Sequence, residues 1–373
     1  MIKIKKKYEE KIISGTIFKG YKPEIINGSI YIDENNIIYD IKEKNINSKF
    51  WIVPRFINLH THIGDSFIKD PKLGKYNYYS FTPSLDYLIK PPNGLKHKLL
   101  STINNKYILK SMKNTFNDLY NTGISTIVDF REGGINGINI LKKASKKSKI
   151  KTIILSRTKD YFWKQETTKK EIKEIINKSD GFGVSGYNDL DKNIIYEMRK
   201  IAKQKKKIFA IHSGEKNNND IEKAISLNPN MIIHLTNATS KHLKKIEDKN
   251  ISVVVCPRSN IITGVGFPPI KEMINRNICV GLGTDNVMLN SPNMFEEINI
   301  LFKLFKLNEK TIYNILTKNS DRLLSMKSST IDIGNPVNLM LLNSKSYNLS
   351  SIFNPLSGFI RRARVDDIAK IIS

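Results

Sequence analysis

The stretch FINLHTHIGDSF, residues 56–67, is an apolar run that ends abruptly at two histidines, His60 and His62. Side chains at positions i and i+2 of a strand point to the same face, so both imidazoles can reach one point. An apolar strand is ordinary core material, and packing gives no reason for two histidines at its end. We therefore expect a buried strand over 55–60 whose carboxyl end carries chemistry.

Seven further apolar stretches follow, separated by longer helical or polar segments. Nearly continuous apolar strands that alternate with helices indicate a parallel sheet buried on both faces. Eight such units over about 275 residues predict an α/β fold, a (β/α)₈ TIM barrel, which builds its active site at the carboxyl ends of its strands. The predicted strands are 55–60, 125–130, 151–156, 181–186, 207–212, 230–235, 251–257 and 278–285.

The two ends of the chain have a different texture from the middle. Short β-like pieces with turn residues occupy 1–52, and STIDIGNPVNLMLLNS at 329–344 resembles them. Neither end can bury a core alone, so we expect 1–52 and 329–373 to form one small β-rich, sandwich-like domain beside a barrel of 53–328. The Pro- and Gly-rich stretch 68–100 is expected to be an extended loop with helical pieces over one barrel face.

The formal net charge of +26 raises the possibility of a nucleic-acid-binding protein, because a basic surface attracts phosphate. Only ten of the 61 basic residues are arginine, the lysines are scattered, and no aromatic-interleaved basic stripe or RNA-binding motif occurs. We therefore expect no specific nucleic-acid partner. A basic binding barrel without catalysis remains the remote alternative.

Other bulk features predict a cytoplasmic protein. No apolar run reaches the ~18 residues of a membrane helix, and the start MIKIKKKYEE lacks the apolar stretch of a signal peptide. Cys256 and Cys279 lie in apolar strands and are expected to be reduced core residues. The oligomeric state is left open, with a homo-oligomer possible.

Polar residues gather at the ends of the predicted strands. His212 ends the fifth strand with Glu215 three residues on, His234 follows the sixth, and Asp285 ends the eighth. Each alone could be a core histidine, a first-turn acid or a helix cap. Together with the first pair they place four of the six histidines at one end of the barrel. Neutral imidazoles with a carboxylate suit Zn²⁺ or Fe²⁺ and leave a position open for water. The remaining two, His97 and His242, are expected at the surface.

The motifs FINLHTHIG, HSGE, VVVCPRSN and GLGTDNVMLNSPNMFEEI, with a histidine after the sixth strand, resemble the amidohydrolase superfamily. The likeness covers nearly the whole chain and is closest to the branch of nucleobase and nucleoside deaminases and chlorohydrolases. It implies one divalent metal ion bound by His60, His62, His212 and Asp285. Zn²⁺ is favoured, and the choice between Zn²⁺ and Fe²⁺ is left open. Glu215 would be the proton shuttle, and His234 would orient the water or the leaving group.

The resemblance implies a metal-dependent hydrolase that acts on carbon–nitrogen bonds other than peptide bonds. The favoured reaction is hydrolytic deamination of an amino-substituted heterocycle, in which Asp285 accepts the proton of water and Glu215 protonates a ring nitrogen. Hydrolysis of a cyclic amide or amidine is the alternative. The fourth strand, GFGVSGYND, lacks the lysine of two-metal relatives. The loop after the first motif does not match that of methylthioadenosine deaminases, so the substrate is left open.

Substrate contacts are the least determined part of the predicted site. Candidates follow the second, third and seventh strands or lie in the long loop, and a structural ion pair is the alternative for the first two. The candidates are Arg131, Glu132, Arg157, Lys69, Asp70, Ser259 and Asn260.

Overall fold

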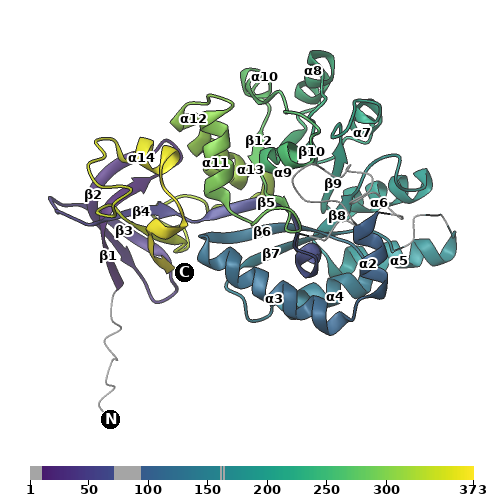
Figure 1. Cartoon of the computed structure of the whole chain (residues 1–373), viewed down its shortest axis with the longest axis horizontal. Coiled ribbons are helices and arrows are strands. Elements are labelled where there is room, and N and C mark those ends of the chain that lie inside the picture. The colour runs from purple at the N-terminus through teal and green to yellow at the C-terminus, as the bar shows by residue number, and fades with distance from the viewer. Residues whose placement is uncertain (1–10, 71–93, 160–161, 163) are drawn as a thin grey trace, which may run out of the picture. The chain divides into compact units, whose positions relative to one another are not determined.

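The computed structural model describes residues 11–70, 94–159, 162 and 164–373 of the chain. The chain divides into two compact units, which Figure 1 shows as ribbons. One unit is Met1–Phe56 with Asn308–Ser373, and the other is Ile57–Leu307. The expected domains, 1–52 with 329–373 and 53–328, remain a prediction.

The larger unit is built on a nine-stranded sheet. The strand order is β12-β11-β10-β9-β8-β7-β6-β5-β13. The strands from β6 to β12 pair in parallel along this order, and β13 pairs in parallel with β5. The strands are β5 (Phe56–His62), β6 (Ile124–Arg131), β7 (Lys151–Ser156), β8 (Gly181–Val184), β9 (Ile208–Ser213), β10 (Met231–His234), β11 (Ser252–Val255), β12 (Val280–Leu282) and β13 (Asp285–Asn286).

The two edges of this sheet are joined by one short stretch of chain. β12 pairs with β11 and β13 pairs with β5, yet only Gly283 and Thr284 separate β12 from β13. A Cβ atom on Gly283 would lie 2.8 Å from the backbone nitrogen of His60, so only glycine permits this approach. Of the predicted (β/α)₈ barrel, the structure shows a curled, nine-stranded parallel sheet, and the predicted eighth strand corresponds to β12 and β13.

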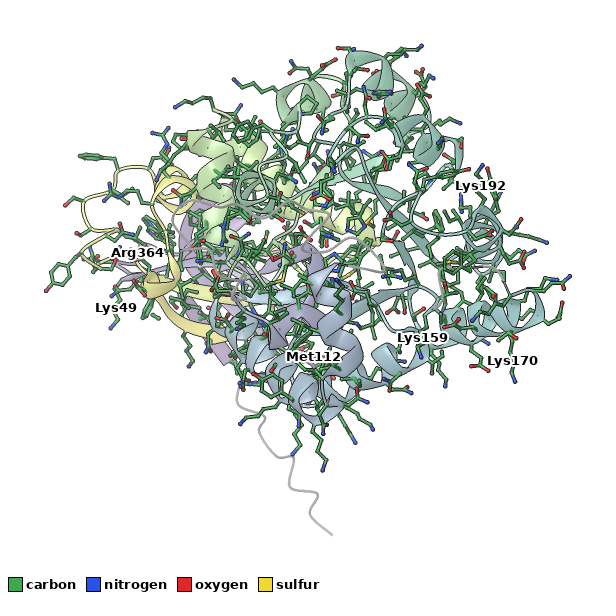
Figure 2. The ribbon with its side chains drawn as sticks, turned by 45° about the vertical axis from the view of Figure 1, so that its right-hand side comes forward. Lys49, Met112, Lys159, Lys170, Lys192 and Arg364 are labelled. Carbon is green, nitrogen blue, oxygen red and sulfur yellow. The ribbon has the colours of Figure 1, made fainter. Side chains whose placement is uncertain are left out.

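Helices alternate with the strands, and many of their lysines face solvent. α6 (Lys192–Gln204) buries five apolar side chains, from Ile194 to Ala202, and leaves Lys192 exposed. In Figure 2 the side chains of Lys159, Lys170 and Lys192 extend outward from the ribbon. The other helices of this unit are η1 (Ile63–Phe67), α2 (Leu95–Thr102), α3 (Asn105–Asn121), α4 (Gly134–Ser145), α5 (Glu166–Lys178), α7 (Ile221–Ser226), α8 (Ser240–Asp248), α9 (Pro257–Ile262), α10 (Ile270–Asn275) and α11 (Met294–Lys303).

The smaller unit is a six-stranded sheet to which both ends of the chain contribute. Its order is β15-β14-β4-β1-β2-β3, in which β1 and β4 are parallel and the other pairs antiparallel. Its strands are β1 (Lys11–Lys19), β2 (Glu24–Ile32), β3 (Ile38–Glu43), β4 (Phe50–Pro54), β14 (Leu339–Asn343) and β15 (Ile368–Ile372), and its helices are α12 (Glu309–Asn314), η2 (Ile315–Asn319), α13 (Ser320–Leu324), α14 (Pro355–Arg361) and η3 (Val365–Asp367).

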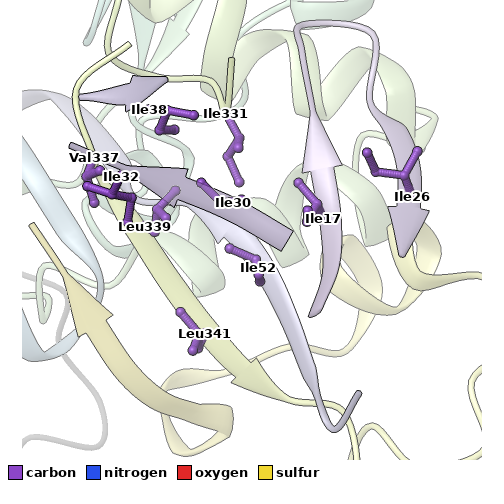
Figure 3. Packing of buried hydrophobic residues seen from close by; sticks show 10 residues of the cluster. All are labelled: Ile17, Ile26, Ile30, Ile32, Ile38, Ile52, Ile331, Val337, Leu339 and Leu341. Carbon is purple, nitrogen blue, oxygen red and sulfur yellow. The ribbon is translucent and has the colours of Figure 1, made fainter. Parts of the chain in front are cut away.

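An apolar cluster holds this sheet together, as Figure 3 shows. Its members alternate along the strands, so their side chains lie on the same face of each strand. They are Ile17, Ile26, Ile30, Ile32, Ile38, Ile52, Ile331, Val337, Leu339 and Leu341. A second sheet, separate from the nine-stranded sheet, is therefore present. That the two ends of the chain form a sandwich-like domain stays a prediction.

Three smaller expectations have different outcomes. The free, buried thiols of Cys256 and Cys279 are confirmed. The surface position expected for His242 is wrong: its residue is 8% exposed, and Nδ1 accepts a hydrogen bond from the backbone nitrogen of Thr239 at 3.1 Å. The side chain of His97 and most of the predicted 68–100 loop lie outside the part of the chain that the structure describes. Among the described helices, none combines the length and apolarity that crossing a membrane requires.

Candidate active site

Three imidazoles and one carboxylate meet at the carboxyl end of the barrel sheet. His60 and His62 come from β5, His212 from β9 and Asp285 from β13, and one ligand atom of each lies within 4.8 Å of the others. Asp285 Oδ1 is 3.1 Å from His60 Nε2 and 3.4 Å from His62 Nε2. His212 Nε2 is 3.1 Å from His60 Nε2. The structure thus brings together all four residues predicted as metal ligands.

The protons of two rings are fixed on the side away from this point. His62 Nδ1 is 3.1 Å from a carboxylate oxygen of Glu132, and His212 Nδ1 is 2.8 Å from the carbonyl oxygen of Val184. Both partners only accept, so each Nδ1 donates and each Nε2 of a neutral ring presents a lone pair. Burial lowers the pKa of His62 to about 4 and that of His212 well below its ordinary value, so the rings are neutral. Converging lone pairs beside a carboxylate fit a divalent cation.

Asp285 is held in place by contacts with β5 and α9. Its φ of 63° is a left-handed conformation that non-glycine residues rarely adopt. Ser259 Oγ donates to Asp285 Oδ2 at 2.5 Å, which leaves Oδ1 facing the histidines. One residue earlier, Thr284 exchanges two hydrogen bonds with the Asn58 amide of β5, at 2.7 and 3.1 Å. These contacts lock the end of β12 and β13 against β5.

Asp285 and Glu215 are two nearby carboxyl groups in opposite protonation states. Burial alone would raise the pKa of Asp285, but its hydrogen bond and charge interaction with His60 hold it well below its usual range. Burial, and then the charge of Asp285, raise the pKa of Glu215 well above its ordinary value. Such a pair provides a base and an acid in one site.

The turn HSGE at the end of β9 is built by side chains that sequence reasoning did not single out. Asp220 accepts hydrogen bonds from Ser213 Oγ at 2.9 Å and from the Gly214 backbone nitrogen at 3.0 Å. Gly214 has a φ of 66°, which suits glycine. The Asn237 amide donates to the backbone carbonyl of Glu215 at 2.7 Å. Polar loop residues of this kind carry no local sequence signal that separates them from solvent-facing ones.

His234 lies between Glu215 and a buried amide. Its Nε2 is 3.6 Å from Glu215 Oε2, and its Nδ1 is 3.1 Å from Asn260 Nδ2. Burial lowers the pKa of His234 to about 4, so this ring is neutral as well. His234 and Leu235 have φ angles of 73° and 51°. Left-handed non-glycine residues cluster at functional sites, where surrounding contacts maintain the strain.

A buried cation from α2 joins two carboxylates behind His62. Lys96 Nζ lies 2.9 Å from Asp65 Oδ1 and 2.5 Å from Glu132 Oε1, the same oxygen that accepts from His62. Although burial alone would lower the pKa of Lys96, the charge of Asp65 and then Glu132 raises it, so the ammonium is charged. Sequence reasoning missed both Lys96 and Asp65. Asp65, three residues after His62, could have been suspected from its place in the motif.

The predicted substrate contacts fall into groups with different surroundings. Arg131 is 2% exposed and pairs with Glu132 Oε2 at 2.6 Å, so the structural ion-pair alternative is favoured for these two. Ser259 and Asn260 are fully buried against Asp285 and His234, which gives them an orienting position.

The other three candidates are divided between the interior and the surface. Arg157 is 4% exposed at the end of β7, whereas Lys69 and Asp70 are exposed after η1. The backbone nitrogen of Asp70 donates to the carbonyl oxygen of Met288 at 2.8 Å. Substrate contact by these residues stays a prediction.

The comparisons with known proteins agree with one another. The model of the amidohydrolase family matches residues 51–362. An uncharacterized protein of Methanocaldococcus jannaschii is 36% identical over 81% of each chain, and a 5'-deoxyadenosine deaminase of Methanosphaera stadtmanae is 25% identical over 86% of this chain and 80% of that one. A crystal structure of a zinc-bound adenosine deaminase from Xanthomonas campestris has a TM-score of 0.79 at 14% identity and covers 97% of this chain and 91% of the other.

Proposed function

Because this chain belongs to the amidohydrolase family, we propose that it hydrolyses a carbon–nitrogen bond other than a peptide bond, by deamination of an amino-substituted heterocycle. The observation that carries the proposal is the pair of buried carboxyl groups, Asp285 and Glu215, whose pKa values are shifted in opposite directions within a cluster of histidines. Deamination needs both a base for water and an acid for the leaving amine, and this pair supplies them at the same pH.

His60, His62, His212 and Asp285 would hold one divalent ion, and three nitrogens with one oxygen suit Zn²⁺. The zinc in the related adenosine deaminase structure supports the same choice over Fe²⁺. When bound, such an ion lowers the pKa of water enough to supply a nucleophile near neutral pH.

The chain's own residues would carry the protons. Asp285 Oδ2 accepts a hydrogen bond from Ser259, so Oδ1 is the oxygen that accepts the proton of the attacking water. Glu215 gives its proton to a ring nitrogen, where it stays, while the proton that Asp285 has taken from water goes to the amino group, which leaves as ammonia. The second proton of the water returns Glu215 to its protonated form. His234 lies next to Glu215 and stabilises charge that develops on the heterocycle.

The substrate class follows from the relatives' names and the chemistry of the site. Relatives are named as deaminases of 5'-deoxyadenosine and of methylthioadenosine or adenosylhomocysteine, so aminopurine nucleosides are the first compounds to test. Hydrolysis of a cyclic amide or amidine would use the same groups, because it also needs a water-derived nucleophile and an acid for nitrogen. A noncatalytic nucleic-acid-binding function does not account for an ionised and a protonated carboxyl group in one site.

The test is ammonia release by zinc-loaded protein across aminopurines, aminopyrimidines, pterins and their nucleosides. We expect release from at least one compound, and loss of that release in Glu215→Gln at unchanged zinc content. Glu222→Gln is the matched control, because Glu222 is exposed and pairs with Lys245. Silence across the panel with one zinc per chain would overturn deamination in favour of ring-amide hydrolysis. Silence without bound zinc would overturn the metal site itself.

A further inference from the structure

The first turn of α9 aims two adjacent side chains at two different residues of the site. Ser259 donates to Asp285, and Asn260 contacts His234. The backbone of Asn260 is fixed on both sides: its nitrogen donates to the Cys256 carbonyl at 3.1 Å, and its carbonyl accepts from the Val265 nitrogen at 3.2 Å. The amide therefore has little freedom to move away from the imidazole.

The contact between Asn260 and His234 is isolated from water. Asn260 is 0% exposed and His234 is 1% exposed. Asn260 Nδ2 is 3.1 Å from His234 Nδ1, and Asn260 Oδ1 is buried with no hydrogen-bond partner in the part of the chain that the structure describes. An amide nitrogen carries only protons, so it can donate to the ring but cannot accept from it.

We propose that Asn260 is a positioning residue that fixes the tautomer of His234, so that the single ring proton resides on Nε2. The inference deepens the proposed function, because it states how His234 is prepared to act there. A neutral imidazole has one N–H and one bare nitrogen, and the nitrogen that accepts a hydrogen bond is the bare one. With Nδ1 accepting from Asn260, Nε2 carries the proton toward Glu215, whose Oε2 is 3.6 Å away.

The tautomer decides whether His234 helps or opposes the reaction. An N–H aimed at developing negative charge stabilises the transition state, and loss of one such donor costs about 10²–10³ in kcat. A bare nitrogen at the same place would direct its lone pair at that charge. If the amide of Asn260 were turned over, its oxygen would accept from Nδ1–H and Nε2 would be bare, so the two arrangements make opposite predictions.

The tautomer can be read directly from the zinc-loaded wild-type protein without any substrate. In protein carrying ¹⁵N-labelled histidine, the ring nitrogens of His234 are assigned by comparison with His234→Gln. We expect the chemical shift of a protonated nitrogen at Nε2 and of a bare, hydrogen-bonded nitrogen at Nδ1. A protonated Nδ1 with a bare Nε2 would overturn the inference.

Asn260→Asp separates the tautomer from the shape of the side chain. A carboxylate of the same size can only accept, so a neutral His234 ring then carries its proton on Nδ1. At a pH where ¹⁵N shifts show that this ring is neutral, we expect kcat to fall about 10²-fold or more with little change in KM. The control is Asn299→Asp, because the side-chain amide of Asn299 also donates a hydrogen bond, to the Phe295 carbonyl in α11. An Asn260→Asp enzyme with wild-type kcat would contradict the inference.

Two controls keep these results separate from other failures. Zinc content and circular dichroism of Asn260→Asp show whether the variant is folded, and the wild-type spectrum decides the question if it is not. Absence of ammonia release from every compound would defeat the proposed function while leaving the tautomer measurement valid. A wrong tautomer in an active enzyme would defeat only the inference on Asn260.

Discussion

At the scale of single residues, the site works by giving like groups unlike surroundings. The hydrogen bond with His60 lowers the pKa of Asp285, whereas burial and the charges of neighbouring acids raise the pKa of Glu215. Burial lowers the pKa of His62 and of His212, and only a neutral imidazole can donate a lone pair to a metal.

The first prediction concerns the pH dependence of kcat/KM. Activity needs Asp285 ionised and Glu215 protonated, so it should fall when pH drops through the depressed pKa of Asp285 and when pH rises through the elevated pKa of Glu215. The profile should be bell-shaped, with a broad plateau that includes neutral pH. A rate that keeps rising to alkaline pH would argue against Glu215 as the acid.

The second prediction concerns Glu297 of α11, which is fully buried and whose pKa burial raises to about 8. The folded state then holds a proton that the unfolded state loses above its ordinary pKa. Protonated Glu297 therefore contributes fully to the free energy of unfolding when the pH is below the ordinary pKa of glutamate. This contribution is lost as pH rises to about 8, by on the order of 1 kcal/mol per pH unit. Thermal unfolding of Glu297→Gln from pH 5 to 9 should show a smaller loss of stability than the wild type, and equal losses would refute this role.

At the scale of elements, the site residues are held by contacts between neighbouring strands and helices as well as by their own places at strand ends. Asn58 joins β5 to the segment before β13, and α9 holds Asp285 and His234 from the other side. These contacts connect segments that are far apart in the chain, so no local sequence pattern predicts them.

The third prediction follows from the contact between β5 and Thr284. In Asn58→Ala a buried donor and acceptor lose their partners, which should lower the free energy of unfolding by about 1–3 kcal/mol. Because His60 and Asp285 are then less well aligned, zinc affinity should fall about 10–100-fold. Competition with a chelator of known affinity measures this, with Asn299→Ala as control. Unchanged zinc affinity would show that Asn58 serves stability alone.

The fourth prediction concerns the attachment of α2. Lys96→Met removes the buried cation and leaves Asp65 and Glu132 without their shared partner, which should destabilise the protein by about 3–5 kcal/mol. Lys110→Met is the control, because Lys110 is an exposed lysine on α3. Urea unfolding followed by circular dichroism compares the two. Equal midpoints would mean that the buried ion pairs contribute nothing net.

At the scale of the whole molecule, the sequence allowed the architecture to be predicted better than the hydrogen bonds and ion pairs of the site. Apolar runs ending in histidine identified the parallel sheet and its functional end, because strand burial and position are local properties. Lys96 follows a long segment with no matching pattern, and its partners are distant in sequence. Ser259 and Asn260 were suspected for the right place, but which neighbour each would bond depends on how separate loops meet.

The account's central claim is that water replaces an amino group, and the product of the reaction tests it most directly. We would incubate zinc-loaded protein with the most active compound in ¹⁸O-labelled water and determine the product's mass. The account predicts a product in which one nitrogen has left as ammonia and one labelled oxygen has taken its place. A product that keeps all its nitrogen and has gained a whole labelled water would contradict deamination and identify ring hydrolysis instead.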